Sequence, residues 1–337
     1  MKKVAVIGNG NWGTTVSRLI ANNITATQDF DSELLLWVHE EMYQHQKLSE
    51  YINALRTNPI YLPGVRLPDN IRAVTSFDEI NEADIFVICL PCKFLDTIKE
   101  IKPKKGSFAI NLSKGLILKD EKLYTPSEYI ESILKIECAS LCGANIAIEV
   151  ATEQLSECTV GYTDKDQINC LEWMFDNDYF RPRIIPHDIG IEICAALKNI
   201  VSLGFGIIEG MEWGSNTKAM LFRKGLVEME RFCKLMKGKF LVLESCCIGD
   251  LLTSCLNGRN FRCGMQMAKD RCKSAEIEKK MGGQKLEGPE TVMMINSWLE
   301  ANNMEIRNFP VFQAIHRICF LGEAPEFLHS VLKKSGE

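Results

Sequence analysis

The stretch "KVAVIGNGNWGTT", residues 3–15, decides how the first half of the chain folds. Residues 4–7 form a short apolar run rich in β-branched side chains, which is typical of a fully buried strand. Gly8, Gly10 and Gly13 follow in the G-x-G-x-x-G spacing. In a strand–turn–helix unit the first glycine permits the tight turn, the second lets a ligand approach the backbone, and the third lets the helix pack closely on the strand. We therefore predict a strand and a helix joined by a turn that a ligand can approach.

The residues around this stretch favour a pyrophosphate as that ligand. A glycine-rich stretch by itself is also typical of an ordinary turn. Here Val16, Leu19 and Ile20 continue an apolar helical pattern after the glycines, and residues 34–38 form a second strand-like run. The N-terminus of such a helix carries unpaired N–H groups and a partial positive charge, and both attract phosphate oxygens. We therefore expect a dinucleotide-binding βαβ unit.

The composition is that of an ordinary globular protein with about two domains. The chain has 337 residues, of which 46% are hydrophobic and 25% are charged. A net charge of −5 and a pI of about 5.7 argue against a general nucleic-acid-binding protein. A local basic pocket is compatible with this charge and would suit a small anionic substrate.

The fourteen cysteines are scattered along the chain, so we expect reduced thiols rather than a disulfide framework. Cys255, Cys263 and Cys272 lack the paired C-x-x-C spacing of a zinc site, and we predict no metal. The first strand begins by residue 3 or 4, which leaves no room for a secretory signal, and no run looks long and apolar enough to cross a bilayer. We expect a cytoplasmic protein that binds neither nucleic acid nor membrane.

The pattern of the chain changes once. The first half alternates strands and helices, which predicts a parallel sheet with helices on both faces. The expected strands are residues 4–7, 34–38, 71–74, 85–90 and 108–112, with a further strand and its exit loop within 139–151 and a polar helix over 40–56. From residue 191 onward almost only helical patterns follow. We predict an α/β Rossmann-like N-terminal domain with a parallel-sheet core over residues 1–187, which binds the cofactor, and an all-α substrate and catalytic domain over residues 188–337.

Lys198 is the strongest candidate for a chemical role. It lies in "EICAALKNIVSLGFG", residues 192–206, which has a helical pattern, and the residues on its helical face are mostly apolar. Most helical lysines are surface charges or lay their alkyl stems along apolar surface. A lysine in apolar surroundings instead has a pKa lowered toward neutrality, which suits a general acid beside a carbonyl. We predict this role for Lys198, with Asn199 anchoring a substrate oxygen.

Two further stretches combine polar side chains with helix boundaries. In "GDLLTSCLNGRNFR", residues 249–262, Asp250, Thr253 and Ser254 share roughly one helical face, and an Asn-Gly pair indicates a helix stop. The stop places Arg259 at a turn, where its planar guanidinium suits phosphate oxygens, although an arginine that only compensates a helix dipole is the alternative. The stretch "GGQKLEGPET", residues 282–291, predicts a polar loop that closes over a cofactor or simply connects two helices.

The first half places further polar groups at strand ends. "LPCKF", residues 90–94, and "NLSKG", residues 111–115, each follow a predicted strand directly. Ligands of open α/β sheets bind at the carboxyl ends of the strands, so we expect Phe94 and Lys114 to line the cofactor crevice. The second strand ends in "WVHEE", where Glu40 and Glu41 disfavour the 2′-phosphate of NADP. NAD is therefore the predicted cofactor.

Eight ordered motifs together resemble one family. They are "GNGNWGTT", "WVHEE", "LSKG", "GANIAIEVA", "EICAALKNIVSLGFGIIEG", "SNTKA", "GDLLTSCLNGRN" and "GQKLEGPET". From about residue 3 to residue 325 the sequence is similar to NAD-dependent glycerol-3-phosphate dehydrogenases of the cytosolic eukaryotic type. The resemblance implies a cytoplasmic homodimer that transfers hydride reversibly between NADH and dihydroxyacetone phosphate, a phosphorylated triose, to give sn-glycerol 3-phosphate.

The resemblance also implies roles for individual residues, with Lys198 as the proton donor and Lys114 orienting the substrate. The implied catalytic residues are Lys198, Lys114, Asp250, Thr253 and Asn199. The implied substrate-binding residues are Lys114, Lys198, Arg259 and Asn260. The implied cofactor-binding residues are Gly8, Asn9, Gly10, Asn11, Trp12, Gly13, His39, Phe94, Ala147, Arg259, Lys285 and Glu287. These roles agree with the chemistry, because a carbonyl that accepts hydride develops negative charge that an ammonium stabilises before it supplies the proton.

Three positions depart from the usual pattern of the family. His39 stands where an aromatic residue is usual, Glu287 where glutamine is frequent, and Ser254 in place of the second threonine of a pair. A carboxylate near a pyrophosphate is repelled unless it turns toward a ribose hydroxyl or a cation such as Lys285. None of the three removes a predicted catalytic group.

Other functions stay open from the sequence alone. A two-domain dehydrogenase with a helical second half that acts on a different hydroxy acid would oxidise a carboxylate substrate and be indifferent to a phosphate ester. A sensor would bind NADH without turnover, which the apolar neighbours of Lys198 argue against. A purely structural role would leave the polar clusters without a purpose.

Overall fold

The computed structural model describes residues 1–281 and 286–334. The chain divides into two compact units: unit 1 is Met1–Lys114 with Pro126–His187, and unit 2 is Gly115–Thr125 with Asp188–Glu337. The hairpin of β10 (Ile117–Lys119) and β11 (Lys122–Tyr124) belongs to unit 2, because Leu116 and Leu123 are buried in that unit's core. The predicted first domain, residues 1–187, had included this hairpin.

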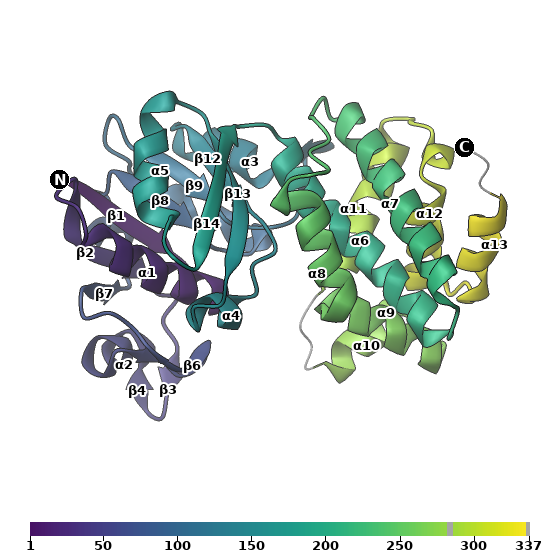
Figure 1. The fold of residues 1–337 in the computed structure, drawn as a ribbon, viewed down its shortest axis with the longest axis horizontal. Coiled ribbons are helices and arrows are strands. Elements are labelled where there is room, and N and C mark those ends of the chain that lie inside the picture. The colour runs from purple at the N-terminus through teal and green to yellow at the C-terminus, as the bar shows by residue number, and fades with distance from the viewer. Residues whose placement is uncertain (282–285, 335–337) are drawn as a thin grey trace. The chain divides into compact units, whose positions relative to one another are not determined.

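Unit 1 is built on one eight-stranded sheet (Figure 1). In spatial order its strands are β14 (Phe180–Pro186), β13 (Ser156–Tyr162), β12 (Cys138–Cys142), β9 (Phe108–Asn111), β8 (Ile85–Ile88), β1 (Lys2–Ile7), β2 (Phe30–Trp37) and β7 (Ile71–Val74). Neighbours from β12 to β7 are all parallel, as the alternating pattern predicts. The Rossmann-like fold of this unit is confirmed.

The strand order reverses at β1. The chain first adds β2 and β7 on one side of β1, and then β8, β9 and β12 on the other. Such a switch point opens a crevice at the carboxyl ends of the two central strands, here β1 and β8. The glycine turn after β1 lies at this edge.

The far end of the sheet adds one antiparallel pairing to the predicted parallel core. β12 and β13 pair antiparallel, whereas β13 and β14 pair parallel. β13 and β14 are not among the strands expected from the sequence. Prolines at 182 and 186 argue against a strand in this part of the sequence. The structure tolerates both because β14 is an edge strand, where proline's missing N–H costs little.

Helices and small hairpins complete unit 1. The helices are α1 (Asn11–Ile24), α2 (Leu48–Leu55), α3 (Pro126–Leu134), α4 (Ala147–Ala151) and α5 (Ile168–Phe175), with 3-10 turns η1 (Phe77–Glu79), η2 (Cys92–Glu100) and η3 (Lys165–Gln167). The hairpins are β3 (Met42–Tyr43) with β4 (Gln46–Lys47), and β5 (Thr57–Asn58) with β6 (Leu62–Arg66). The predicted helix over 40–56 is therefore wrong in its first half, where β3 and β4 turn back on each other. α1 buries Val16, Leu19 and Ile20, as its apolar pattern predicts.

Unit 2 is helical throughout its described part apart from the β10–β11 hairpin. Its helices are α6 (Gly190–Gly210), α7 (Ser215–Leu235), α8 (Asp250–Asn257), α9 (Arg259–Asp270), α10 (Ser274–Lys280), α11 (Glu287–Ala301), α12 (Pro310–His316) and α13 (Glu326–Lys334), with short turns η4 (Ser245–Gly249), η5 (Ile306–Asn308) and η6 (Arg317–Leu321). α6 packs against α7, α8, α9 and α11 (Figure 1). Two glycines permit its close approach to α9, because a Cβ at Gly206 would lie 2.0 Å from the Phe261 carbonyl oxygen and one at Gly264 2.0 Å from that of Leu203.

The central helix corrects the expectation that no segment is long and apolar enough to cross a bilayer. α6 meets that test by length and composition, and 94% of its most apolar window is buried inside the protein. Its apolar surface is covered by neighbouring helices, so unit 2 accounts for it as a core helix.

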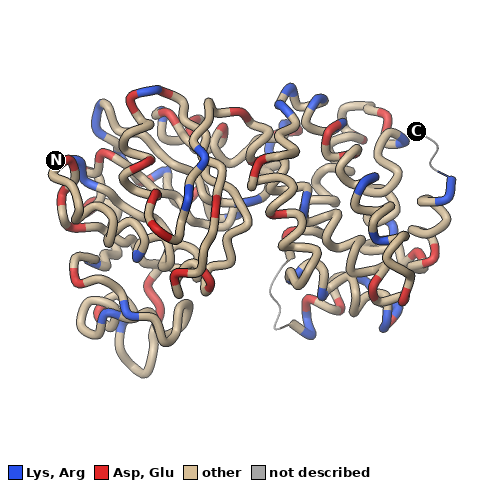
Figure 2. The backbone as a smooth tube through the Cα atoms, viewed as in Figure 1, with Lys and Arg blue, Asp and Glu red and all other residues tan. Residues whose placement is uncertain are grey.

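Charges and thiols follow no single pattern over the fold. Figure 2 shows basic and acidic residues interspersed along the backbone of both units. The fourteen cysteines form no disulfide among the residues that the structure describes.

Candidate active site

The three glycines of the β1–α1 turn differ in what a side chain at each position would meet. Gly8 has a φ of +114°, and a Cβ on it would lie 2.9 Å from the Cys89 carbonyl oxygen. A Cβ on Gly13 would lie 1.9 Å from the Gly8 carbonyl oxygen, whereas a Cβ on Gly10 would meet nothing within 4 Å. Gly8 and Gly13 are thus required by the packing of the turn, while Gly10 borders open space through which a ligand can reach the backbone.

Asn9 offers a buried donor at this turn. It is 4% exposed, and its Oδ1 accepts a hydrogen bond from the backbone N–H of His39 at 3.0 Å. That bond orients the amide, and Nδ2 then has no hydrogen-bond partner within the described part of the chain. A buried donor without an acceptor is costly unless a ligand supplies one. Phosphate or ribose oxygens would do so, and the start of α1 has no side-chain cap, so the turn fits a dinucleotide.

The other predicted cofactor residues of unit 1 lie around strand ends. Asn11 and Trp12 begin α1, with Trp12 packed against Phe180 at a ring distance of 6.3 Å. The Ala147 carbonyl accepts a hydrogen bond from the Thr15 hydroxyl at 3.2 Å, which brings the start of α4 to α1. His39 is exposed just after β2.

Phe94 and Lys114 follow the neighbouring strands β8 and β9. Phe94 lies in η2 with half of its surface exposed. Lys114 is partly buried, and its Nζ donates to the Gly143 carbonyl oxygen at 3.0 Å, just beyond β12. The topology thus places both residues at the carboxyl edge of the sheet, as predicted for side chains that follow parallel strands.

Glu40 and Glu41 have local partners in the structure. Glu40 accepts hydrogen bonds from the Ser49 backbone N–H at 3.1 Å and the Ser49 hydroxyl at 2.6 Å, at the start of α2. Glu41 accepts from the Tyr61 hydroxyl at 2.8 Å, and burial together with this carboxylate raises the pKa of Tyr61 to about 12. Both carboxylates are therefore held close to the end of β2, where they leave a negative charge.

Lys198 lies in α6 and is 6% exposed. Its Nζ lies 2.6 Å from Oδ1 of Asp250 and donates to the Ser254 hydroxyl at 2.6 Å. The predicted helical face is confirmed as buried, but the ammonium itself does not lie in apolar surroundings, because α8 presents a carboxylate and a hydroxyl to it. A buried charge requires such partners.

Ser254 lies closer to the centre of the site than the sequence predicts. It contacts Lys198 directly, whereas the neighbouring Thr253 donates its hydroxyl to the Gly249 carbonyl oxygen at 3.1 Å. The signal in the sequence was the spacing, since Asp250 and Ser254 are four residues apart and so lie one above the other on a helix.

A polar network lies beside this cluster. Asn199 Nδ2 donates to Oε2 of Glu287 at 3.0 Å, and Asn260 Nδ2 donates to Oδ1 of Asn199 at 2.9 Å. The backbone N–H of Gly288 donates to Oδ1 of Asn260 at 2.9 Å. Asn199 and Asn260 are buried, while the guanidinium of Arg259 is about half exposed and lies 4.0 Å from Oε1 of Glu287. Unit 2 thus gathers residues that lie up to about ninety positions apart in the sequence.

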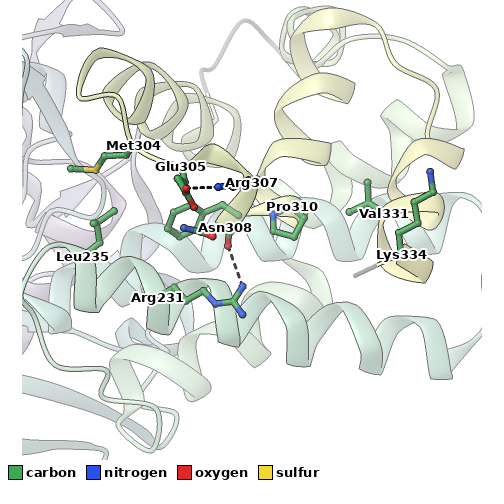
Figure 3. A pocket seen from close by; sticks show the side chains of 10 residues that line it. Arg231, Leu235, Met304, Glu305, Arg307, Asn308, Pro310, Val331 and Lys334 are labelled. Atoms are coloured by element: carbon green, nitrogen blue, oxygen red, sulfur yellow. Dashed lines mark hydrogen bonds and ion pairs between the residues drawn. The ribbon is translucent and has the colours of Figure 1, made fainter. Parts of the chain in front are cut away.

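Two features lie outside these clusters. Lys285, a predicted cofactor residue, falls outside the described residues. A pocket of about 740 Å³ lies elsewhere in unit 2 and contains none of the predicted site residues (Figure 3). In it Arg231 Nη1 donates to the Asn308 carbonyl oxygen at 3.2 Å, and Glu305 pairs with Arg307.

Comparison with known proteins identifies the family. The model of the NAD-dependent glycerol-3-phosphate dehydrogenase N-terminus matches residues 3–168, and that of the C-terminus matches residues 188–329. The chain belongs to the NAD-dependent glycerol-3-phosphate dehydrogenase family. It is an oxidoreductase of that family with NAD as its cofactor, and the resemblance read from the eight motifs is confirmed.

Individual glycerol-3-phosphate dehydrogenases are similar over nearly their whole length. The cytoplasmic NAD(+) enzyme of Homo sapiens is 37% identical over 338 residues, which cover 97% of each chain. The solved structure from Plasmodium falciparum has a TM-score of 0.94 at 35% identity and covers 100% of this chain and 96% of that one. The structure from Saccharomyces cerevisiae has a TM-score of 0.91 at 35% identity and covers 99% of both.

Proposed function

We propose that the chain catalyses the reversible reduction of dihydroxyacetone phosphate to sn-glycerol 3-phosphate, with Lys198 as the proton donor. The observation that carries this proposal is the buried ammonium of Lys198, held at 2.6 Å by both Asp250 and Ser254. An ammonium held in one position in a site of low dielectric stabilises the oxygen of a carbonyl under reduction. It then supplies the proton that completes the alcohol. When bound, NADH supplies the hydride.

Asp250 and Ser254 hold the ammonium group of Lys198 in one orientation. Asp250 stabilises the charged ammonium, and Asp250 together with Ser254 fixes the position from which its Nζ meets a substrate oxygen. In the reverse direction the neutral amine accepts the alcohol proton, and Asp250 stabilises the ammonium that forms. We propose Asn199 as a further donor toward substrate, and Thr253 and Lys114 as contributors to its orientation.

The phosphate side is proposed for α9. Arg259 offers a half-exposed planar guanidinium suited to two phosphate oxygens, and Asn260 follows it at the start of the helix. Charge-assisted pairs of this kind contribute more than neutral hydrogen bonds. In unit 1 we propose that Gly8–Gly13, His39, Phe94 and Ala147 bind NAD, with the orphaned amide of Asn9 donating to it.

We also propose that the protein is cytoplasmic and forms a homodimer. Relatives whose names include "cytoplasmic" support a cytoplasmic location, and the resemblance read from the sequence implies a homodimer. Light scattering of the purified protein tests the assembly, because a monomeric mass would contradict it.

One experiment tests the function. NADH absorbance is followed with dihydroxyacetone phosphate, with unphosphorylated dihydroxyacetone, and with NADPH in place of NADH. We expect fast oxidation only with NADH and the phosphorylated ketone. Arg259→Ala should lower kcat/KM for the phosphorylated substrate by at least about tenfold, since loss of a charge-assisted pair typically costs a few kcal/mol. Binding of NADH without oxidation would favour a sensor instead.

A further inference from the structure

Glu287 is a carboxylate at the start of α11 that lies next to two proposed substrate-binding residues, Asn199 and Arg259. Its Oε2 accepts a hydrogen bond from Asn199 at 3.0 Å, and its Oε1 lies 4.0 Å from the guanidinium of Arg259. Asn199 is the residue after Lys198. Glu287 therefore connects the proposed phosphate-binding arginine to the turn of α6 that carries the proposed proton donor.

The hydrogen bonds around Glu287 can run in only one order from donor to acceptor. A carboxylate is an acceptor only, and the backbone N–H of Gly288 is a donor only. Between them, Asn260 Oδ1 faces Gly288, Asn260 Nδ2 faces Asn199 Oδ1, and Asn199 Nδ2 faces Glu287. Both amides are thus prevented from flipping, because a flip would place donor against donor or acceptor against acceptor. Loss of the carboxylate would leave the buried Asn199 amide without this acceptor.

The contact with Arg259 has the opposite character. At 4.0 Å, with the Arg259 and Glu287 side chains 48% and 39% exposed, it is a long and solvated ion pair. Pairs of this kind are weak, so a phosphoryl group with two negative charges can displace the carboxylate from the guanidinium. After displacement the carboxylate and the phosphoryl group lie near the same cation and repel each other.

We propose that Glu287 is a positioning and affinity-setting residue: it orients Asn199 through the amide network and competes with the phosphate ester of the substrate for Arg259. This inference rests on the proposed function of Arg259. Its two effects are separable, because a neutral amide keeps an acceptor for Asn199 and loses the charge, whereas an apolar side chain loses both.

Two substitutions separate the effects. Glu287→Gln should bind glycerol 3-phosphate roughly three- to tenfold more tightly and lower KM for dihydroxyacetone phosphate by a similar factor, because the competing charge is gone. Glu287→Leu should instead lower kcat by about tenfold or more, because Asn199 loses the acceptor that orients it. Glu290→Gln is the matched control, since it removes the same charge from an exposed position one turn along α11.

Binding is measured without turnover, by the rise of the unfolding temperature with glycerol 3-phosphate, with inorganic phosphate and, separately, with NADH. We expect the gain for Glu287→Gln with glycerol 3-phosphate and phosphate, and its disappearance in the Arg259→Ala background, because the charge acts through that guanidinium. A gain confined to NADH would overturn the assignment to the substrate's phosphate. Equal behaviour of Glu287→Gln and Glu290→Gln would overturn the competition.

Binding data for the single variants distinguish an error about Arg259 from an error about Glu287. If Arg259→Ala alone leaves the affinity for glycerol 3-phosphate unchanged, the proposed phosphate role of Arg259 is wrong. If Arg259→Ala weakens that affinity as expected but Glu287→Gln does not strengthen it, only the inference about Glu287 is wrong.

Discussion

Lys198 and Asp250 form a buried ion pair across two helices, with Nζ and Oδ1 2.6 Å apart and the two side chains 7% and 4% exposed. Because both charges are removed from water, each is stable in its buried position only while the other compensates it. The pair therefore links the proposed chemistry of unit 2 to its stability, and substitutions at Lys198 should affect both.

Lys198→Met should abolish most of the turnover. The substitution keeps the length of the side chain and removes the ammonium, so the reaction loses its general acid and the stabilisation of the carbonyl oxygen. We expect a fall in kcat of at least about 100-fold. Lys198→Arg should not restore activity, because a guanidinium does not release its proton at working pH. A Lys198→Met enzyme with more than about a tenth of wild-type kcat would rule out the proposed role.

The same substitution should destabilise the fold. Lys198→Met leaves Asp250 as a buried carboxylate without its counter-ion, which typically costs about 3–5 kcal/mol of unfolding free energy. Lys198→Met combined with Asp250→Asn should recover part of this loss, because the remaining side chain is neutral. Urea denaturation of the three proteins gives the values, and equal stability of the single and double variants would contradict a buried ion pair.

Alanine should affect stability at one glycine of the β1–α1 turn and cofactor binding at another. Gly13→Ala places a methyl group against the Gly8 carbonyl oxygen, where a Cβ would lie 1.9 Å away, and should cost about 3 kcal/mol or more. Gly10→Ala meets open space and should change the unfolding free energy by less than about 0.5 kcal/mol. It should nevertheless weaken NADH binding, measured by fluorescence titration, because the methyl group occupies the path of the phosphates. Normal NADH affinity in Gly10→Ala would contradict the placement of the cofactor.

NADH should be strongly preferred over NADPH, and Glu40 with Glu41 should be the cause. Replacing both by glutamine keeps acceptors for Ser49 and Tyr61 and removes two negative charges near the end of β2. We expect the ratio of kcat/KM for NADH and NADPH to narrow by roughly tenfold. Glu50→Gln, on the exposed side of α2, is the control and should leave the ratio unchanged.

Glu228 should make stability depend on pH. It is 2% exposed in α7 and accepts the backbone N–H groups of Val311 and Phe312 at 2.7 and 2.9 Å, yet burial raises its pKa to about 8. The folded state therefore holds the proton more tightly than the unfolded state. This contribution is fully present below a pH of about 4.5 and is lost as the pH rises to about 8, by at most about 1.4 kcal/mol per pH unit.

The measurement is urea denaturation of the wild type and Glu228→Gln at pH 6 and pH 8.5. The wild type should lose more stability between these values than the variant, because glutamine does not titrate. An equal loss in both proteins would show that Glu228 is ionised at pH 6 and that the expected shift is absent.

The sequence by itself determined the features that depend on neighbouring residues. The β1–turn–α1 unit follows from four apolar residues and three glycines, since strand formation, the sharp turn and close packing are all local requirements. The burial of α6 follows from apolar residues on every side of one helix. The ordered motifs were enough to indicate the family, because each motif is a short run of neighbouring residues that can be recognised without the fold.

Only the tertiary structure decided which distant residues meet. Helical spacing places Asp250 and Ser254 on one face of α8, but the contact of that face with Lys198, 52 and 56 residues earlier, depends on how α8 packs on α6. The choice of Ser254 over Thr253 is a matter of helix rotation. The antiparallel pairing of β12 with β13 likewise depends on the route of the chain between them. Local patterns specify the side chains that a helix or strand presents, whereas the partner that covers them is decided by the packing of the whole unit.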